Sequence, residues 1–300
     1  MKNQLPLLVF FTLILNACAA SRGIYTPENP ILPDHFARVD TLGSSLTAPS
    51  KLRSSSEQYL LPSDQKQVFD QFISVFENST TVLQYGYIEN LNDGRGFTAG
   101  RAGFTSRDGD MLDVVRYYLT LNPQSSLALY LPRLIALNDE GSDATLGLEN
   151  LPLAWAEASE DPNFKAAQDY ISDQLYYLPA VKRAKKFNIK SDLGILCFYD
   201  TAIQHGVDGE EGLDNIISRL GRRSHYESEA TYLNEFLKVR RGILMDPVDK
   251  STRKVWQESV GRVDTLQAIL LSKRLNQLAP MTISPFDESE SYLIQRIEQP

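Results

Sequence analysis

From residue 110 onward, hydrophobic residues recur with the spacing of an α-helix, and Pro or Gly separates many of the segments. Apolar side chains at i, i+3, i+4 and i+7 form one stripe, which must be buried against another element. Helices are predicted at 111–119 (ending near Pro123), 127–137, 164–177 (ended by Pro179), 191–205, 213–220, 231–245 and 252–275. This pattern restricts the chain to a mainly helical fold.

A further helix and a small sheet are predicted before residue 110. In the segment that begins at Ser63, helical spacing relates Phe69, Phe72, Ile73 and Phe76. Residues 81–88 are rich in β-branched and aromatic side chains, which is typical of a strand. The Asp93-Gly94 step predicts a turn that returns residues 97–99 as a second strand. The expected fold class is mainly α (within α+β), with two helical lobes and a small antiparallel sheet flanking a cleft.

The composition excludes several kinds of function. With 42% hydrophobic and 23% charged residues, the chain is an ordinary globular protein. Its formal net charge of −8 argues against nucleic acid as a partner. Two cysteines, Cys18 and Cys197, rule out a disulfide framework or a multi-thiolate zinc site, and the three histidines lack ligand-like spacing. We expect no metal and no cofactor, and Cys197 is expected to be buried rather than nucleophilic.

The first twenty residues are predicted to be a secretory signal peptide. Their apolar run, from Leu5 to Leu15, is shorter than the roughly 20 residues that span a bilayer. The end of the run resembles a bacterial lipobox, in which Cys18 would carry a lipid, but it also fits ordinary cleavage that discards Cys18. Either route predicts an extracellular protein, secreted or lipid-anchored at the cell envelope, that meets a membrane only through this lipid.

The remaining chain divides by composition. Residues 21–57 are rich in Pro, Ser and Thr without helical periodicity, so they are predicted to be a flexible arm or tether. A folded domain of two lobes is expected at 58–275, followed by a C-terminal tail at 276–300.

Two carboxylates have the local environments of an acid and a base. Glu77 follows Phe76 at the C-terminal end of the first helix, where the helix dipole and an aromatic neighbour both raise a carboxyl pKa. Asp93 lies in a polar turn near Arg95, which favours its ionised form. A protonated and an ionised carboxyl suit general acid and general base catalysis. Taken alone, however, a Glu at a helix end and an Asp before Gly are more often a solvated carboxylate and a turn former.

Several motifs resemble those of the glycoside hydrolase family 46 chitosanases, and especially their Bacillus-type branch. They are Phe76-Glu77-Asn78-Ser79-Thr80, residues 85–89, Asp93-Gly94-Arg95-Gly96-Phe97-Thr98-Ala99-Gly100, and residues 103–106, 109–110, 130–132, 166–169, 175–177, 199–201, 204–206 and 262–264. The resemblance covers roughly residues 60–275 and implies a lysozyme-like fold.

The resemblance also implies a reaction, endo-hydrolysis of β-1,4-linked glucosamine with inversion. It makes Glu77 the proton donor, Asp93 the base that activates water and Thr98 a residue that helps to hold this water. An inverting pair leaves about 6.5–9.5 Å between the carboxyl groups for the water. Residues expected to bind substrate are Ser79, Tyr87, Glu89, Arg95, Asp110 and His205.

The implied partner is chitosan or a chito-oligosaccharide, whose ammonium groups an acidic groove attracts. Asp110 is a candidate contact for one 2-amino group, with an N-cap of the following helix as the alternative. Arg95 either lines the groove or pairs with Asp93 or Glu89. His205 either lines the cleft or is structural. A monomer is expected.

Three charged residues share helix faces with apolar residues. Asp200, Arg240 and Arg262 must pair, because a lone buried charge is prohibitive. We predict an ion cluster of these three side chains, which supports the lobe junction rather than the chemistry.

Two other functions remain open from the sequence. One is a different lysozyme-like glycan hydrolase that acts on peptidoglycan. The other is a non-catalytic glycan-binding lipoprotein. The presence of Glu77, Asp93 and Thr98 together argues against both.

Overall fold

The computed structural model describes residues 63–221, 223–224, 227–284 and 290–297. The predicted signal peptide, Cys18 and the arm at 21–57 lie outside these ranges. The helices are α2 (Ser63–Asn78), α3 (Asp110–Leu121), α4 (Leu131–Glu140), α5 (Leu151–Ala158), α6 (Pro162–Ser172), α7 (Leu178–Lys186), α8 (Asp192–His205), α9 (Leu213–Leu220), α10 (Glu229–Met245), α11 (Arg253–Glu258) and α12 (Val260–Leu271). Short 3-10 turns occupy Ser126–Tyr130 and Lys250–Thr252, and a π turn occupies Asp173–Tyr177.

The strands form two small antiparallel sheets. One has the order β1 (Ile88–Asn90), β2 (Phe97–Ala99) and β3 (Phe104–Thr105), and the other pairs β4 (Met281–Ile283) with β5 (Tyr292–Ile294). The mainly helical class with a small antiparallel sheet is therefore confirmed. Within the described ranges, none of the helices combines the length and the apolar character needed to cross a membrane.

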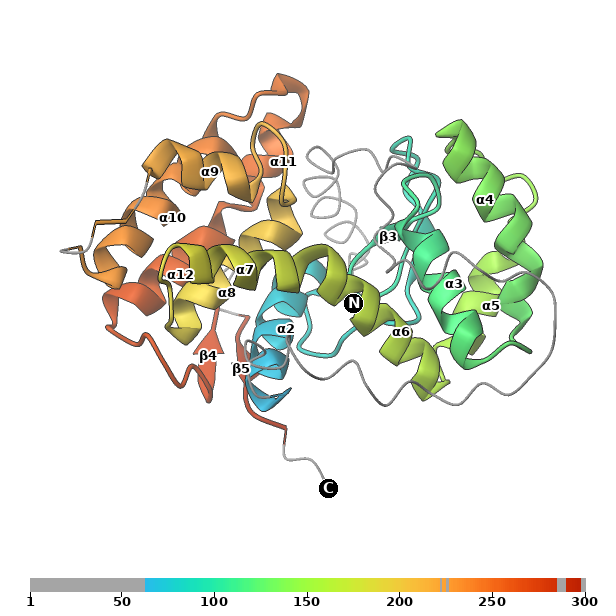
Figure 1. The fold of residues 1–300 in the computed structure, drawn as a ribbon, viewed down its shortest axis with the longest axis horizontal. Coiled ribbons are helices and arrows are strands. Elements are labelled where there is room, and N and C mark those ends of the chain that lie inside the picture. Colours follow the sequence, from blue (N-terminus) through green and yellow to red (C-terminus); the bar gives the residue numbers. More distant parts are fainter. Residues whose placement is uncertain (1–62, 222, 225–226, 285–289, 298–300) are drawn as a thin grey trace, which may run out of the picture.

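Two hydrophobic cores define two lobes (Figure 1). The smaller core lies among the three-stranded sheet and helices α3 to α6. The larger core lies among α2, helices α7 to α12 and the β4–β5 hairpin. In Figure 1, α6 and α7 run end to end from the smaller lobe on the right to the larger lobe on the left.

The strand predicted at 81–88 is mostly wrong, because only its last residue is in a strand. Residues 81–87 form a loop. The carbonyl oxygen of Tyr85 accepts hydrogen bonds from Trp155 Nε1 at 3.0 Å and Gln168 Nε2 at 2.9 Å. Side chains of the smaller lobe thus satisfy this backbone in place of a neighbouring strand. The return strand at 97–99 is confirmed, and β3 and α5 were not predicted.

Two predicted helix ends also differ. Pro179 does not end the 164–177 helix, because the helical backbone continues into α7. A proline clashes with the carbonyl four residues earlier, here that of Leu175, and this carbonyl lies within the π turn. The 252–275 helix is divided at Ser259, whose hydroxyl donates to the Trp256 carbonyl oxygen at 2.7 Å. A serine that bonds to the local backbone competes with helical pairing.

The C-terminal hairpin belongs to the larger lobe. Ile294 is fully buried, and Gln71 of α2 donates to the carbonyl oxygen of Gln295 at 2.8 Å. Arg296 forms an ion pair of 2.9 Å with Asp64 in the first turn of α2. The described part of the tail at 276–300 is thus packed on the helix that carries Glu77.

Candidate active site

Glu77 lies in the last turn of α2 and is only 7% exposed. Its Oε1 atom accepts a hydrogen bond from Arg262 Nη1 on α12, and among the described residues Oε1 is the atom of this carboxylate that is bonded. The Arg262 guanidinium lies 5.7 Å from the centre of the Phe76 ring. One oxygen of Glu77 is therefore held in place, while Oε2 is left to interact with a ligand.

Asp93 lies in the loop between β1 and β2 and is held by Arg95. Its Oδ2 atom accepts from Arg95 Nη2 at 2.5 Å and from Nε at 2.9 Å, and Oδ1 accepts from the Arg95 backbone N–H at 3.2 Å. Arg95 was expected either to line the groove or to pair with an acidic residue, and the structure shows the pair with Asp93. These bidentate hydrogen bonds from a guanidinium fix the orientation of the Asp93 carboxylate.

Thr98 lies in β2 opposite Glu89 of β1. It is fully buried, and its Oγ1 atom has no hydrogen-bond partner among the described residues. Glu89 itself accepts a 3.0 Å hydrogen bond from the Tyr87 hydroxyl. Burial and this bond to a carboxylate raise the pKa of Tyr87. Thr98 thus contributes a buried hydroxyl group in β2 that is able to bind a further polar group.

Asp110 is the first residue of α3 and ties this helix to the sheet. Its Oδ1 atom accepts from the backbone N–H of Thr105 at 2.6 Å and of Met111 at 3.0 Å. The N-cap of α3 is Gly109, so the alternative that made Asp110 the N-cap is wrong by one residue. The Asp110 carboxylate nevertheless accepts hydrogen bonds from backbone N–H groups at this end of the helix. Ser79 ends α2 in the left-handed region, with φ of 51°.

Asp113, one turn further along α3, yields a test of stability against pH. Burial raises its pKa to about 7, with Arg116 opposing the shift and Asp110 adding to it. The folded state therefore keeps a proton that the unfolded chain loses near 3.8, so the free energy of unfolding falls as pH rises from about 4 to about 7.

We expect Asp113→Asn to remove this loss and to stabilise the protein at pH 8 by about 2–4 kcal/mol. At pH 5 the gain should be much smaller. Thermal unfolding of both proteins at the two pH values measures the difference, and an equal gain at both would contradict the assignment.

His205 does not line a cleft. It is fully buried, and its ring packs edge-on against Trp256 with 4.8 Å between centroids. Burial, with the nearby charges of Arg240 and Arg262, lowers the pKa of His205 well below 6.5. The expected substrate contact is thus corrected to a structural, neutral histidine. Cys197 is buried as expected, and burial raises the pKa of its thiol.

The predicted cluster of three charges is present. Asp200 Oδ2 accepts from Arg240 at 2.6 Å, and Oδ1 accepts from Arg262 at 2.6 Å, with all three side chains buried. They come from α8, α10 and α12, all in the larger lobe, so the cluster does not join the two lobes. Instead it reaches the catalytic candidate Glu77 through Arg262.

A second buried ion cluster, missed from the sequence, does join the lobes. Arg101 of the β2–β3 turn contacts Asp70 of α2 at 2.7 Å. Asp70 shares its face of α2 mainly with polar residues, such as Ser74 and Glu77, so its burial could not be predicted from the apolar spacing.

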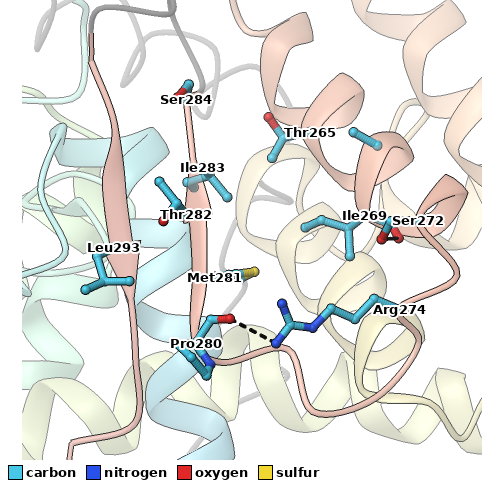
Figure 2. Close-up of a pocket in the computed structure, with 11 residues that line it drawn as sticks. Thr265, Ile269, Ser272, Arg274, Pro280, Met281, Thr282, Ile283, Ser284 and Leu293 are labelled. Carbon is cyan, nitrogen blue, oxygen red and sulfur yellow. Dashed lines mark hydrogen bonds between the residues drawn. The ribbon is translucent and has the colours of Figure 1, made fainter.

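A separate cavity of about 640 Å³ lies between α12 and the C-terminal hairpin (Figure 2). Ile269, Met281 and Ile283 contribute apolar surface, and Arg274 donates to the Pro280 carbonyl oxygen at 2.9 Å. None of the candidate catalytic residues lines it.

Comparison with known proteins places the chain in a family. Residues 71–281 match the model of Glycosyl hydrolase family 46. The chain is 43% identical to a chitosanase of Bacillus subtilis (strain 168) over 230 residues. This alignment covers 74% of this chain and 83% of that protein.

Two solved structures agree with this result. A chitosanase of Gynuella sunshinyii in complex with chitotetraose superposes with a TM-score of 0.71 and 40% identity, over 78% of this chain and 99% of the other. A mutant chitosanase of Bacillus subtilis MY002 complexed with 6 GlcN gives a TM-score of 0.72 and 41% identity, over 78% and 100% of the two chains. The resemblance found in the motifs is thereby confirmed, and this chain belongs to glycosyl hydrolase family 46.

Proposed function

We propose that this protein is an inverting endo-chitosanase that cleaves β-1,4 linkages between glucosamine units of chitosan. The observation that carries the proposal is the family match over residues 71–281, which includes Glu77, Asp93 and Thr98. It is supported by relatives that are named chitosanases and by neighbouring structures that hold chitotetraose or 6 GlcN.

In the proposed mechanism, Glu77 is the general acid. Its Oε2 atom carries the proton to the glycosidic oxygen, while Oε1 stays on Arg262. Asp200 accepts a second hydrogen bond from the same guanidinium, so part of the positive charge of Arg262 is offset away from Glu77. This sharing lets Arg262 orient the carboxyl group without binding it as strongly as an isolated arginine would.

Asp93 is the proposed general base, and Thr98 helps to hold the attacking water. Arg95 orients the Asp93 carboxylate through three hydrogen bonds. The buried Thr98 hydroxyl, which has no partner in the described part of the chain, is suited to bind a water beside this base. Attack on the face opposite the leaving group then inverts the anomeric carbon.

Charge favours the proposed substrate. A chain with a net charge of −8 attracts a polymer of ammonium groups and disfavours neutral N-acetylated glycans. Asp110 and Glu89 are the proposed acidic contacts, although each already accepts hydrogen bonds within the protein. Ser79, Tyr87 and Arg95 are proposed as further groove residues, and the protein is proposed to act as a monomer.

Export of the enzyme is part of the proposal. Residues 1–20 act as a signal peptide, and the mature protein is extracellular, either free or anchored through a lipid on Cys18. Mass spectrometry of the mature N-terminus distinguishes a lipidated Cys18 from cleavage beyond it.

Reducing-sugar release from chitosan, chitin and peptidoglycan tests the function. We expect release from chitosan alone, and the α-anomer as the first product in NMR spectra recorded during the reaction. Asp93→Asn should lower kcat by about 10²–10⁴, because an amide cannot take the proton from water. Release from peptidoglycan but not chitosan would reject the substrate, and a first-formed β-anomer would reject inversion.

A further inference from the structure

The ion pair between Asp70 and Arg101 connects the two lobes. Arg101 Nη2 lies 2.7 Å from Asp70 Oδ1, and the two side chains are only 4% and 8% exposed. Asp70 belongs to α2 in the larger lobe, whereas Arg101 follows β2 of the smaller lobe. Because the pair is shielded from water, removing one of its charges leaves the other buried with one ion-pair partner fewer.

Each partner lies close in the chain to one of the proposed catalytic residues. Asp70 precedes Glu77 by seven residues, so the two side chains share a face of α2, about 10 Å apart along its axis. Arg101 follows Thr98 by three residues, in the same hairpin region as Asp93. The ion pair therefore links the helix of the acid to the sheet of the base.

On the smaller-lobe side, the backbone at Arg101 is held rigidly. Its N–H donates to Gln168 Oε1 at 3.1 Å, and the N–H of Gly100 donates to the Tyr87 carbonyl oxygen at 2.7 Å. Gly100 has φ of 69°, and a Cβ there would meet Gln168 Oε1 at 2.3 Å. Arg101 also contacts Asp169 at 2.5 Å within its own lobe.

On the larger-lobe side, Asp70 is held equally well. It accepts from Lys66 Nζ at 2.8 Å and from the Tyr199 hydroxyl at 3.0 Å. Burial acts to raise the pKa of Asp70, but Arg101 and Lys66 overcome it and lower the pKa, so the carboxylate stays charged. Both ends of the link are thus fixed to their lobes by further polar contacts.

We propose that Asp70 and Arg101 are positioning residues that set the width of the gap between Glu77 and the Asp93–Thr98 pair. This inference rests on the proposed function. An inverting enzyme needs a gap of one water, and a misplacement of about 1 Å can cost about 10²-fold in rate. A short, buried link between the two supporting elements is suited to hold that distance.

Kinetics of Asp70→Asn and Arg101→Met test the role in catalysis. We expect kcat on chitosan to fall about 10- to 100-fold with KM changed less than about 2-fold. Arg101→Lys, which keeps the charge, should recover part of the loss. Assays are run well below the measured Tm of each variant, so that unfolding does not lower the rate.

Asp214→Asn is the control that removes an ion pair within one lobe, at a more exposed position. Asp214 receives two hydrogen bonds from Arg183, at 2.7 and 2.5 Å, but this pair joins α7 and α9 within the larger lobe. Its kcat should equal that of the wild type. An unchanged kcat in both Asp70→Asn and Arg101→Met, or an equal loss in the control, would overturn the proposal.

A distance measurement tests the link independently of activity. Leu129 in the smaller lobe and Leu271 at the end of α12 are 79% and 71% exposed, so cysteines there can carry spin labels, in a Cys18→Ser background where Cys197 is buried. We expect Asp70→Asn to broaden the distance distribution between the labels. An unchanged distribution would reject the link whether or not chitosan is the substrate, whereas a wild type inactive on chitosan would reject the proposed function alone.

Discussion

Glu77→Gln is expected to lower kcat on chitosan at least about 10³-fold while the protein stays folded. Glutamine has nearly the same shape, and its amide oxygen can still accept the hydrogen bond from Arg262. It has no acidic proton to give to the glycosidic oxygen, and general acid catalysis contributes about 10²–10⁴-fold. Reducing-sugar release under saturating chitosan, with circular dichroism as a check of folding, measures the effect.

Glu211→Gln is the control for this substitution. Glu211 is also 7% exposed, and its Oε1 atom accepts from the backbone N–H of Val248 at 2.6 Å, away from the proposed site. The same chemical change there should leave kcat within about 2-fold. Activity of Glu77→Gln within 10-fold of the wild type would remove Glu77 from the role of general acid.

The second large effect concerns stability. Arg262→Met should lower the free energy of unfolding by about 3–5 kcal/mol, the usual cost of breaking a buried ion pair. Arg262 is buried and bridges Asp200 and Glu77, and these two carboxylates raise its pKa against the effect of burial. Without Arg262, Glu77 loses its ion-pair partner and Asp200 keeps Arg240 alone. Urea unfolding followed by fluorescence measures the change.

Arg241→Met provides the comparison on the neighbouring helix α10. Arg241 pairs with Asp264 at 2.8 Å, but the two side chains are 47% and 50% exposed. Exposed pairs contribute about 0–1 kcal/mol. Equal losses for Arg262→Met and Arg241→Met would mean that the buried ion pairs of Arg262 stabilise the fold no more than an exposed pair does.

Much of the local structure could be predicted because it depends on nearby residues. The apolar spacing of Phe69, Phe72 and Phe76 defines α2, and the Asp93-Gly94 turn defines the return of β2. The strand predicted at 81–88 was mostly wrong because a strand needs a neighbouring strand as well as the right residues. Here the side chains of Trp155 and Gln168 bond to the Tyr85 carbonyl oxygen instead. The missed break at Ser259 has a similar cause, a side chain that competes for backbone hydrogen bonds.

The pairing of Asp200, Arg240 and Arg262 was also predictable, since charges on apolar faces must find one another. Their location was not. Periodicity assigns a residue to a face but does not say which other face it meets. The expectation that this cluster joins the lobes therefore failed, and the link made by Asp70 and Arg101 was found only in the structure.

By itself, the sequence determined the mainly helical class, the small sheet and the family motifs that contain Glu77 and Asp93, because helix periodicity, turn chemistry and motif order are all carried by residues close together in the chain. The tertiary structure decided which partners these groups have. Glu77 and Arg262 lie 185 positions apart, and His205 became buried through packing against Trp256. Such contacts depend on how helices pack across the whole lobe, which no local pattern encodes.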